Sequence, residues 1–197
     1  LKGTDVPVNS LAGLALAPLL DGRLQFTPER YAATYRTWLE NLRDWPISRQ
    51  LWWGHQIPVW RGPVGALFGA PGAMDKRSAE NEQKDSRLFT IRTRIENVNV
   101  AFSTRQEDGT TVAYVCVPHD QPEIETLLEN SGFVRDADVL DTWFSSALWP
   151  FSTLGWPEPT PELKKFYPGD VLCTAREIIT LWVSRMVMMG QYCAGDI

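Results

Sequence analysis

Cysteine is scarce in this sequence, and its few cysteines are not arranged for metal or disulfide chemistry. Cys116, Cys173 and Cys193 are widely separated and odd in number, and no CxxC or CxxH spacing occurs. We therefore expect free thiols, with no disulfide framework and no structural zinc site. Reduced thiols are typical of the cytosol, so a cytoplasmic location is expected.

Long apolar runs and recognisable catalytic or nucleotide motifs are missing as well. No run of about 18 apolar residues occurs, so no membrane-spanning helix is expected. Glycines gather between Gly65 and Gly72, but without the Lys-Ser/Thr or strand–helix context of a phosphate-binding loop. The two histidines, His55 and His119, are far apart and have no serine or cysteine elbow nearby, which argues against a hydrolytic triad.

The chain has no excess of positive charge and no typical beginning. Its net charge is −5 and its pI is about 5.1, so bulk electrostatics do not indicate a polyanionic partner. It starts Leu1-Lys2-Gly3-Thr4-Asp5, with neither an initiator methionine nor a signal peptide. The 197 residues suffice for one or two domains, and we expect them to be an internal part of a longer protein.

Tryptophan and proline are abundant by contrast. The nine tryptophans and 14 prolines favour packed, rigid loops around a specific site over long regular elements. Six of the nine tryptophans lie in two segments, 45–60 and 138–150.

Local signals predict three helices before residue 135. The first is a short apolar helix or turn over 10–20, and the third covers 121–131 and ends at Gly132. The second has Thr27 as N-cap and Pro28 at the first helical position, and Pro46 ends it. Its apolar stripe at three- and four-residue spacing comprises Tyr31, Tyr35, Trp38, Leu39, Leu42 and Trp45.

Strand signals fall mainly between these helices. We expect a short strand over 57–60, strand structure over 88–103 with a parity change near Asn97, and a returning strand over 111–117. Glu107-Asp108-Gly109 predicts the hairpin turn between the last two. A Gly/Pro/Ala-rich and then charged stretch over 62–87 predicts a linker. We interpret 63–137 as a small α+β module inserted into a larger fold.

Near the C-terminal end, the pattern predicts a strand that leads directly into a helix. The strand covers 171–173, Thr174 to Glu177 form a capping-box pattern, and the helix extends to about Met189. This βα geometry is where α/β sheets bind ligands. Glu177, Ile178 and Trp182 lie in the first two turns, with Trp143 as a possible opposite wall. They suit an ammonium group on a small apolar side chain, although a capping Glu and core Ile and Trp explain the same spacing.

Three polar residues in the tryptophan-rich segments have alternative roles. Asp138 and Asp141 can cap a turn, hold a cationic side chain or take part in acid–base chemistry, and structural capping is the preferred interpretation. Arg49 suits phosphate or carboxylate, with an internal salt bridge as the simpler role.

The two segments together resemble the valyl-tRNA synthetases, which are class I aminoacyl-tRNA synthetases. The resemblance covers about 27–61 and 136–190. It depends on Ile47-Ser48-Arg49-Gln50-Leu51-Trp52-Trp53-Gly54-His55 and on the nearly continuous signature from Asp141 to Pro157. The family's HIGH and KMSKS signatures do not occur in the sequence. This chain departs from many relatives at Ala175-Arg176-Glu177, where they have Gly-aromatic-Asp, and at Pro46, where they often have Cys.

The resemblance implies an α/β fold, part of a Rossmann-like class I synthetase catalytic domain with the inserted module. Residues 1–62 would end the connective segment and 138–197 would belong to the second Rossmann half. It implies a valine pocket formed by Trp143, Ile178 and Trp182, with Glu177 at the substrate ammonium. The implied substrates are valine, ATP with Mg²⁺, and tRNA(Val). No zinc, no membrane and a monomer are expected, and the chain alone is expected to be inactive.

Two other functions fit parts of the sequence. The 63–137 unit is alternatively an independent module that binds tRNA or a protein, since Arg87, Arg92, Arg94 and Arg105 can present a basic strand face. A solvated strand face explains them more simply. Within the same class, an isoleucyl- or leucyl-type synthetase shares Ile-Ser-Arg-Gln, but Leu51-Trp52-Trp53-Gly54-His55 favours the valyl type.

Overall fold

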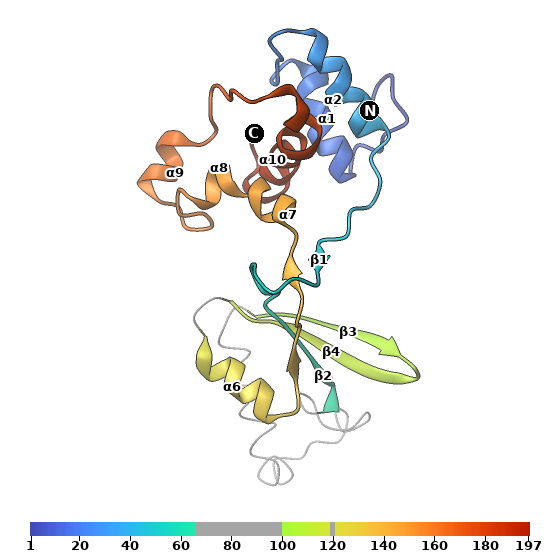
Figure 1. The fold of residues 1–197 in the computed structure, drawn as a ribbon, viewed down its shortest axis with the longest axis vertical. Coiled ribbons are helices and arrows are strands. Elements are labelled where there is room, and N and C mark those ends of the chain that lie inside the picture. The colour runs from blue at the N-terminus through green and yellow to red at the C-terminus, as the bar shows by residue number, and fades with distance from the viewer. Residues whose placement is uncertain (66–99, 119–120) are drawn as a thin grey trace, which may run out of the picture. The chain divides into compact units, whose positions relative to one another are not determined.

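A computed structural model describes residues 1–65, 100–118 and 121–197 (Figure 1). The chain divides into two compact units. The first unit comprises Leu1–Arg49 and Leu140–Ile197, and the second comprises Gln50–Val139. Most of the predicted linker over 62–87, and most of the strand structure predicted over 88–103 with its parity change, lie outside the described residues.

The first unit begins with two helices, α1 (Leu11–Asp21) and α2 (Arg30–Glu40). Helix α1 confirms the prediction over 10–20, and the hydroxyl of Ser10 caps it by accepting a hydrogen bond from the Gly13 amide. The two helices are joined inside the core, where the Tyr35 hydroxyl donates to the Ala15 carbonyl at 2.8 Å. The second helix is correctly predicted as an element, and Tyr35 and Leu39 of its apolar stripe are buried.

The predicted limits of this second helix are wrong at both ends. Its N-cap is Glu29, without a side-chain cap, and neither Thr27 nor Pro28 takes the predicted position. The helix ends at Glu40, well before Pro46. The side-chain amide of Asn41 donates to the Thr37 carbonyl at 2.8 Å, and a side chain that takes a helical carbonyl competes with the next turn of helix.

After residue 140 the first unit continues with three short helices, α7 (Thr142–Ala147), α8 (Trp149–Ser152) and α9 (Pro161–Phe166). Phe151 of α8 is fully buried, with the rings of Trp156 and Tyr167 edge-on to it at 5.3 and 5.5 Å. Helix α9 is capped by Thr160, whose hydroxyl accepts from the Leu163 amide. The proline-rich character of this segment therefore produces short helices around an aromatic centre.

The C-terminal helix predicted to extend to Met189 exists, but it changes geometry along its length. It begins as a 3₁₀ turn (Arg176–Ile178), continues as a π-helical segment (Ile179–Val183), and becomes α10 (Ser184–Met189) before a second π-helical turn (Gly190–Ala194). The hydroxyl of Ser184 donates to the Thr180 carbonyl at 2.5 Å. Such local departures from α-helical pairing are frequent at functional positions.

The strand predicted over 171–173 and the capping box after it are wrong. Residues 171–175 have no regular structure, and Val171 is 84% exposed. No described strand pairs with this segment, so its backbone has no ladder to join. The Thr174 hydroxyl donates to the Ala175 carbonyl, and the helical segment begins after Ala175 without a side-chain cap. The βα geometry expected here is therefore absent from the described chain.

The core of the first unit combines its N-terminal and C-terminal parts. Side chains from α1, α2, the first π-helical segment and α10 pack together, with Val6 before them. Burial of this apolar surface is the main stabilising term for such a unit. The buried set is Val6, Ala15, Leu16, Tyr35, Leu39, Ile179, Val183, Met186, Val187 and Met188.

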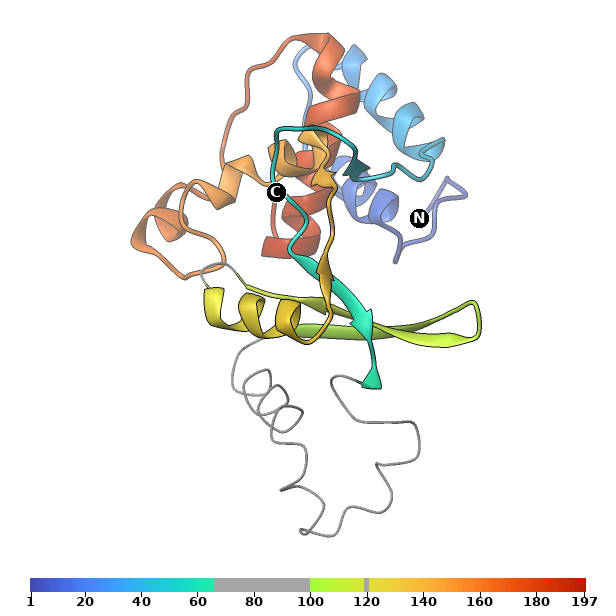
Figure 2. The ribbon, with the colours of Figure 1, turned by 60° about the horizontal axis from the view of Figure 1, so that its bottom comes forward.

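The second unit is an antiparallel sheet with one helix, α6 (Pro122–Asn130) (Figure 2). The strands are β2 (Val59–Pro63), β3 (Ala101–Glu107), β4 (Thr110–Cys116) and β5 (Val134–Arg135), in the order β3-β4-β2-β5. The hairpin turn is confirmed, because Asp108 and Gly109 both have positive φ, at 47° and 77°. Positive φ at both central residues is the type I′ geometry that suits a two-residue hairpin.

Helix α6 and the sheet enclose the second core. Ile124 and Leu128 are buried and Leu127 is partly buried beside them, and Gly132, at a φ of 83°, follows the helix. Trp60 of β2 is fully buried, and the Arg135 guanidinium lies 4.8 Å from its ring centroid. The Phe133 ring lies so close to Gly62 that a Cβ there would be 2.5 Å from it. The buried set is Trp60, Ala113, Val115, Val117, Ile124, Leu128 and Phe133.

The second unit begins earlier than the predicted boundary at residue 63. Strand β2 pairs with both β4 and β5, so a boundary at its last residues would divide the sheet. The expected strand over 57–60 is this β2, shifted toward the C-terminus. Two further short strands, β1 (Ser48–Arg49) and β6 (Val139–Leu140), pair with each other. Among the described residues, no helix is long and apolar enough to span a membrane.

Candidate functional site

The predicted site residues lie in the first unit, where Trp182 holds the C-terminal helix to α7. Its indole Nε1 donates to the Ser146 carbonyl of α7 at 3.0 Å. The Trp149 ring lies 6.0 Å from the Trp182 ring, tilted by 49°. Trp182 is only half-buried, so one hydrogen bond and one ring contact fix an indole that still reaches the surface.

Trp143 lies on the same short helix as Ser146. Residues three apart are neighbours on a helix, which places Trp143 beside the residue that accepts the Trp182 hydrogen bond. Trp143 is also half-buried. The structure thus brings Trp182 against the helix that carries Trp143, two segments separated by more than thirty residues in sequence.

Glu177 and Ile178 lie at the beginning of the C-terminal helical segment. Ile178 is half-buried and Glu177 is exposed, both in the 3₁₀ turn. Within the described ranges, neither residue has a hydrogen bond, ion pair or ring contact to Trp143 or Trp182. The structure therefore associates the two tryptophans more closely than it associates them with Glu177 or Ile178.

A second group of residues, missed as a group by sequence reasoning, surrounds Trp45 in the same unit. We call Trp45, Arg49, Asp141 and Arg185 the Trp45 cluster. The Trp45 Nε1 donates to Asp141 Oδ2 at 2.9 Å, and Arg49 Nε lies 3.3 Å from Asp141 Oδ1. Over the Trp45 ring lie two guanidiniums, that of Arg185 at 4.6 Å and that of Arg49 at 6.0 Å. A cation within about 6 Å of an indole is attracted by its ring quadrupole.

This cluster resolves two of the sequence-based alternatives. Arg49 forms the predicted internal salt bridge. Asp141 stands at the N-cap of α7 but makes no side-chain cap hydrogen bond, so the capping interpretation is wrong and the cation-holding one is correct. Asp138 accepts a hydrogen bond from Gln50 Nε2 at 2.7 Å in the second unit.

Arg185 is the most unusual member, because its guanidinium is buried within an apolar helix. Arg185 is 9% exposed, and Nη1 donates to the Leu181 carbonyl at 2.8 Å. Burial lowers the pKa of Arg185 from its ordinary value, and the nearby Asp141 carboxylate acts in the opposite direction. The sequence contains a signal for this site, because Arg185 stands between the apolar residues Val183 and Met186. Arginine is almost never buried without a partner, so a partner for Arg185 could have been expected.

In the second unit, the only described arginine of the predicted basic face is Arg105. Its guanidinium lies 5.9 Å from the Tyr114 ring centroid, and β3 is exposed along almost all of its length. Arg61 pairs with Glu107, which also accepts from the Tyr114 hydroxyl. The hydrogen bonds from Arg61 and Tyr114 hold the pKa of Glu107 below its usual value. Of these two described arginines, Arg61 is thus paired with a carboxylate and Arg105 lies against a tyrosine ring. Arg87, Arg92 and Arg94 lie outside the described residues.

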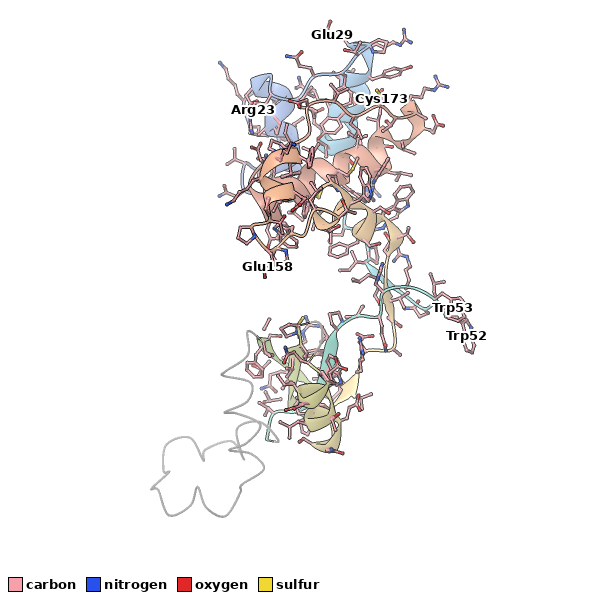
Figure 3. The ribbon with its side chains drawn as sticks, turned by 90° about the vertical axis from the view of Figure 1, so that its left-hand side faces the viewer. Arg23, Glu29, Trp52, Trp53, Glu158 and Cys173 are labelled. Carbon is pink, nitrogen blue, oxygen red and sulfur yellow. The ribbon has the colours of Figure 1, made fainter. Side chains whose placement is uncertain are left out.

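Two further features bear on ligands. Within residues 1–65, 100–118 and 121–197, no group of three or more His, Cys, Asp or Glu side chains is placed to hold a metal ion, and the absence of zinc stays a prediction. Trp52 and Trp53 of the Leu51-Trp52-Trp53-Gly54-His55 motif are 97% and 90% exposed in the second unit (Figure 3). The two tryptophans of the motif that most favours the valyl type are therefore exposed and lie outside both described cores.

Comparison with known proteins gives the family. The model of class I tRNA synthetases (I, L, M and V) matches residues 6–196. Curated relatives named valine–tRNA ligase include those of Rhodopirellula baltica, 45% identical over 98% of this chain, and Rhizobium meliloti, 44% identical over 97%. A third, from Brucella suis, is 42% identical over 98%.

The chain spans about 18% of the length of the first two relatives and 16% of the third. No solved structure matches it. The family match covers nearly all of the sequence, including both tryptophan-rich segments, so the chain belongs to the class I tRNA synthetases of the isoleucine, leucine, methionine and valine group.

Proposed function

We propose that this chain is part of a valine–tRNA ligase, an enzyme that activates valine with ATP and transfers it to tRNA(Val). The observation that carries the proposal is the identity of 42–45% to enzymes of that name over nearly the whole chain. Relatives of the isoleucyl or leucyl type are the alternative within the same family. The relatives' length places most of such an enzyme outside these residues.

Within that enzyme, the two compact units take different roles. We assign 63–137 to a small α+β module inserted into the catalytic domain, whose sheet also includes β2 from just before residue 63. Residues 138–197 belong to the second half of a Rossmann-like catalytic domain, and 1–62 to the end of the connective segment. The antiparallel sheet with a single helix supports a separate module.

The valine pocket comprises Trp143, Ile178 and Trp182, with Glu177 at the substrate ammonium. Small apolar ligands are held by shaped apolar walls, with few polar groups to orient them. Half-buried indoles at Trp143 and Trp182 offer such walls, because each still has accessible ring surface. Glu177 is exposed, which leaves its carboxylate accessible to a cation.

The chain's own residues would bind and orient valine, while ATP chemistry would depend on the rest of the enzyme. In the whole enzyme, ATP with Mg²⁺ would supply the α-phosphate that valine's carboxylate attacks, and pyrophosphate would leave. The HIGH and KMSKS signatures do not occur here, so this chain alone is proposed to be inactive. The whole enzyme is proposed to be a cytoplasmic monomer that binds tRNA(Val) and needs no zinc in this part.

A segment exchange tests the function. Residues 1–197 replace the matching segment of the Rhodopirellula baltica relative, and amino-acid-dependent pyrophosphate exchange is measured with valine, isoleucine, leucine and methionine. We expect exchange with valine at a KM close to that of the unexchanged enzyme. Exchange that responds only to isoleucine or leucine would overturn the valyl assignment.

The pocket residues are tested in the same exchanged enzyme. Trp182→Ala removes one proposed wall and is expected to raise the KM for valine by roughly tenfold or more, as loss of a buried indole contact predicts. Trp156→Ala is the matched control, because Trp156 is also half-buried in the first unit but contacts Phe151. Equal effects of the two variants on the valine KM would contradict the pocket.

A further inference from the structure

Trp45 links two helical segments that are far from it in sequence. Its indole Nε1 bonds to Asp141, which lies 96 residues away, and its ring lies under the Arg185 guanidinium at 4.6 Å. Arg49 completes the arrangement by pairing with the other carboxylate oxygen of Asp141. One indole therefore contacts both an anion and a cation supplied by separate parts of the first unit.

The two partners of Trp45 stand next to the two tryptophans of the proposed pocket. Asp141 is the N-cap residue of α7 and precedes Trp143 by two positions. Arg185 follows Trp182 by three positions, so the two lie within one turn of the same continuous helical segment. A shift of Trp45 would thus be transmitted to the start of α7 and to the helix that carries Trp182.

The chemistry of the Trp45 cluster favours a role in fixing geometry. A buried arginine has a desolvation cost, which apolar packing would avoid, and here burial lowers the pKa of Arg185. Its guanidinium is directed by the carbonyls of Thr180 and Leu181 and by the Trp45 ring. Polar networks whose members are all paired are more directional than apolar contacts and select one arrangement of the elements they join.

We propose that Trp45, Asp141 and Arg185 act as positioning residues that set the separation and tilt of Trp143 and Trp182, and so determine the width of the amino-acid pocket. The inference rests on the proposed function only in identifying these tryptophans as pocket walls. The three residues touch no substrate in this scheme. They act through the helices that carry the two indoles, in parallel with the direct Trp182–Ser146 hydrogen bond.

The first test uses the 197-residue chain itself and needs no enzymatic activity. Trp45→Phe keeps an aromatic ring under Arg185 but removes the hydrogen bond to Asp141. Trp38→Phe is the matched control, because Trp38 Nε1 is buried and has no hydrogen-bond partner among the described residues. Hydrogen exchange of the Trp182 indole N–H is followed by NMR.

We expect Trp45→Phe to accelerate exchange of the Trp182 indole proton by roughly tenfold, about the effect of losing one charge-assisted hydrogen bond on local opening. Trp38→Phe is expected to leave it unchanged. If both variants change the exchange rate equally, or neither does, the coupling between Trp45 and Trp182 is absent and the proposal is overturned.

The second test uses the segment-exchanged enzyme. Trp45→Phe is expected to raise the KM for valine by roughly fivefold while the KM for ATP and the fraction of active enzyme stay the same. Asp141→Ala is expected to raise the KM for valine as well. Asp141→Asn keeps an oxygen acceptor for Trp45 Nε1, so its KM for valine should stay close to that of the unsubstituted enzyme. A role in stability alone would lower the active fraction, leave the valine KM unchanged, and overturn the proposal.

The two tests separate this inference from the function on which it rests. If the exchanged enzyme does not use valine, the proposed function fails, yet the indole exchange experiment still decides whether Trp45 positions Trp182. If valine is used but Trp45→Phe matches Trp38→Phe in indole exchange and leaves the valine KM unchanged, the function stands and the positioning role is wrong.

Discussion

The two units of this chain reach stable folds by different means. The second unit has regular strands, a two-residue turn and one α-helix, and its hairpin joins residues close in sequence. The first unit has short helices, a 3₁₀ turn and π-helical segments, held by contacts such as Trp45–Asp141 and Trp182–Ser146, which are 96 and 36 residues apart.

The difference between the two units shows which kinds of contact accompany irregular helix geometry and which accompany regular strands. In the second unit, Ala113 and Val115 of β4 alternate toward the core that includes Ile124 and Leu128 of α6, and this alternation requires a regular strand. In the first unit, the C-terminal helix packs its apolar side chains into the core, while Trp182 donates to the Ser146 carbonyl and the Arg185 guanidinium lies over the Trp45 ring. A helix that must hold both its apolar packing and these directed contacts departs from α geometry where the two do not coincide. A strand that packs on one face has only one such constraint and stays regular.

The largest expected effect comes from removing the centre of the second core. Trp60→Ala deletes a fully buried indole and is expected to lower the free energy of unfolding by about 3–5 kcal/mol. Urea unfolding combined with backbone hydrogen exchange measures it. We expect protection to be lost in β2, β4 and α6 and retained in α1, α2 and α10.

Trp52→Ala is the control for that experiment, since Trp52 is 97% exposed and its loss should change the unfolding free energy by less than about 0.5 kcal/mol. If Trp60→Ala reduced hydrogen-exchange protection equally in both units, the two units would unfold together. The idea that each unit is stabilised separately, by its own kind of contact, would then be wrong.

A smaller effect is expected from adding one methyl group to the same core. Gly62→Ala places a Cβ about 2.5 Å from the Phe133 ring, and overpacking of this kind costs about 1–3 kcal/mol. The pair Gly62→Ala and Phe133→Leu should recover part of the loss, because leucine is smaller and can move aside. Chemical denaturation of the single and double variants measures the coupling. Strictly additive losses would show that the ring does not press on β2.

The smallest effect is expected from Tyr35, and it reports on the first unit alone. Tyr35→Phe removes the hydrogen bond to Ala15 and is expected to cost about 1 kcal/mol at neutral pH. Burial raises the pKa of Tyr35 above its ordinary value, so its stabilising contribution is complete below about pH 10 and is lost as the pH rises further. The cost of Tyr35→Phe should therefore shrink above pH 10.

Tyr31→Phe is the control on the same helix. The Arg30 side chain lowers the pKa of Tyr31, the opposite direction, so its substitution should not become less costly with rising pH. Unfolding free energies at pH 8, 9.5 and 10.5 would decide between the two. A constant cost of Tyr35→Phe across this range would contradict the burial argument.

Several elements were predictable because their signals are local. Ser10 caps α1, Asp108 and Gly109 form the hairpin turn, and Ile124 and Leu128 line one face of α6. In each case the residue that produces the signal lies within a few positions of its partner. Arg49 was also correctly assigned to an internal ion pair, although its partner lies far away in the sequence.

The errors occurred where distant or competing contacts decide. Thr27 and Pro28 resemble a helix start, but the helix begins after Glu29 and Asn41 ends it early. The strand predicted over 171–173 has suitable residues but no partner strand in the described chain. For the candidate site, Trp182 bonds to the helix that carries Trp143, and the pocket itself stays a prediction. Arg185 was overlooked because Trp45, whose ring it covers, lies 140 positions away in a segment that local patterns do not relate to it.

The sequence by itself determined the family, through motifs in both tryptophan-rich segments, and the elements whose caps, turns and alternation are local. Tertiary structure alone decided the limits of α2, the changing geometry of the C-terminal helix and the assembly of the Trp45 cluster. The physical reason is that a hydrogen bond or cation–π contact needs a few ångströms of proximity and a defined direction. Only the folded core brings Trp45, Asp141 and Arg185 within that range.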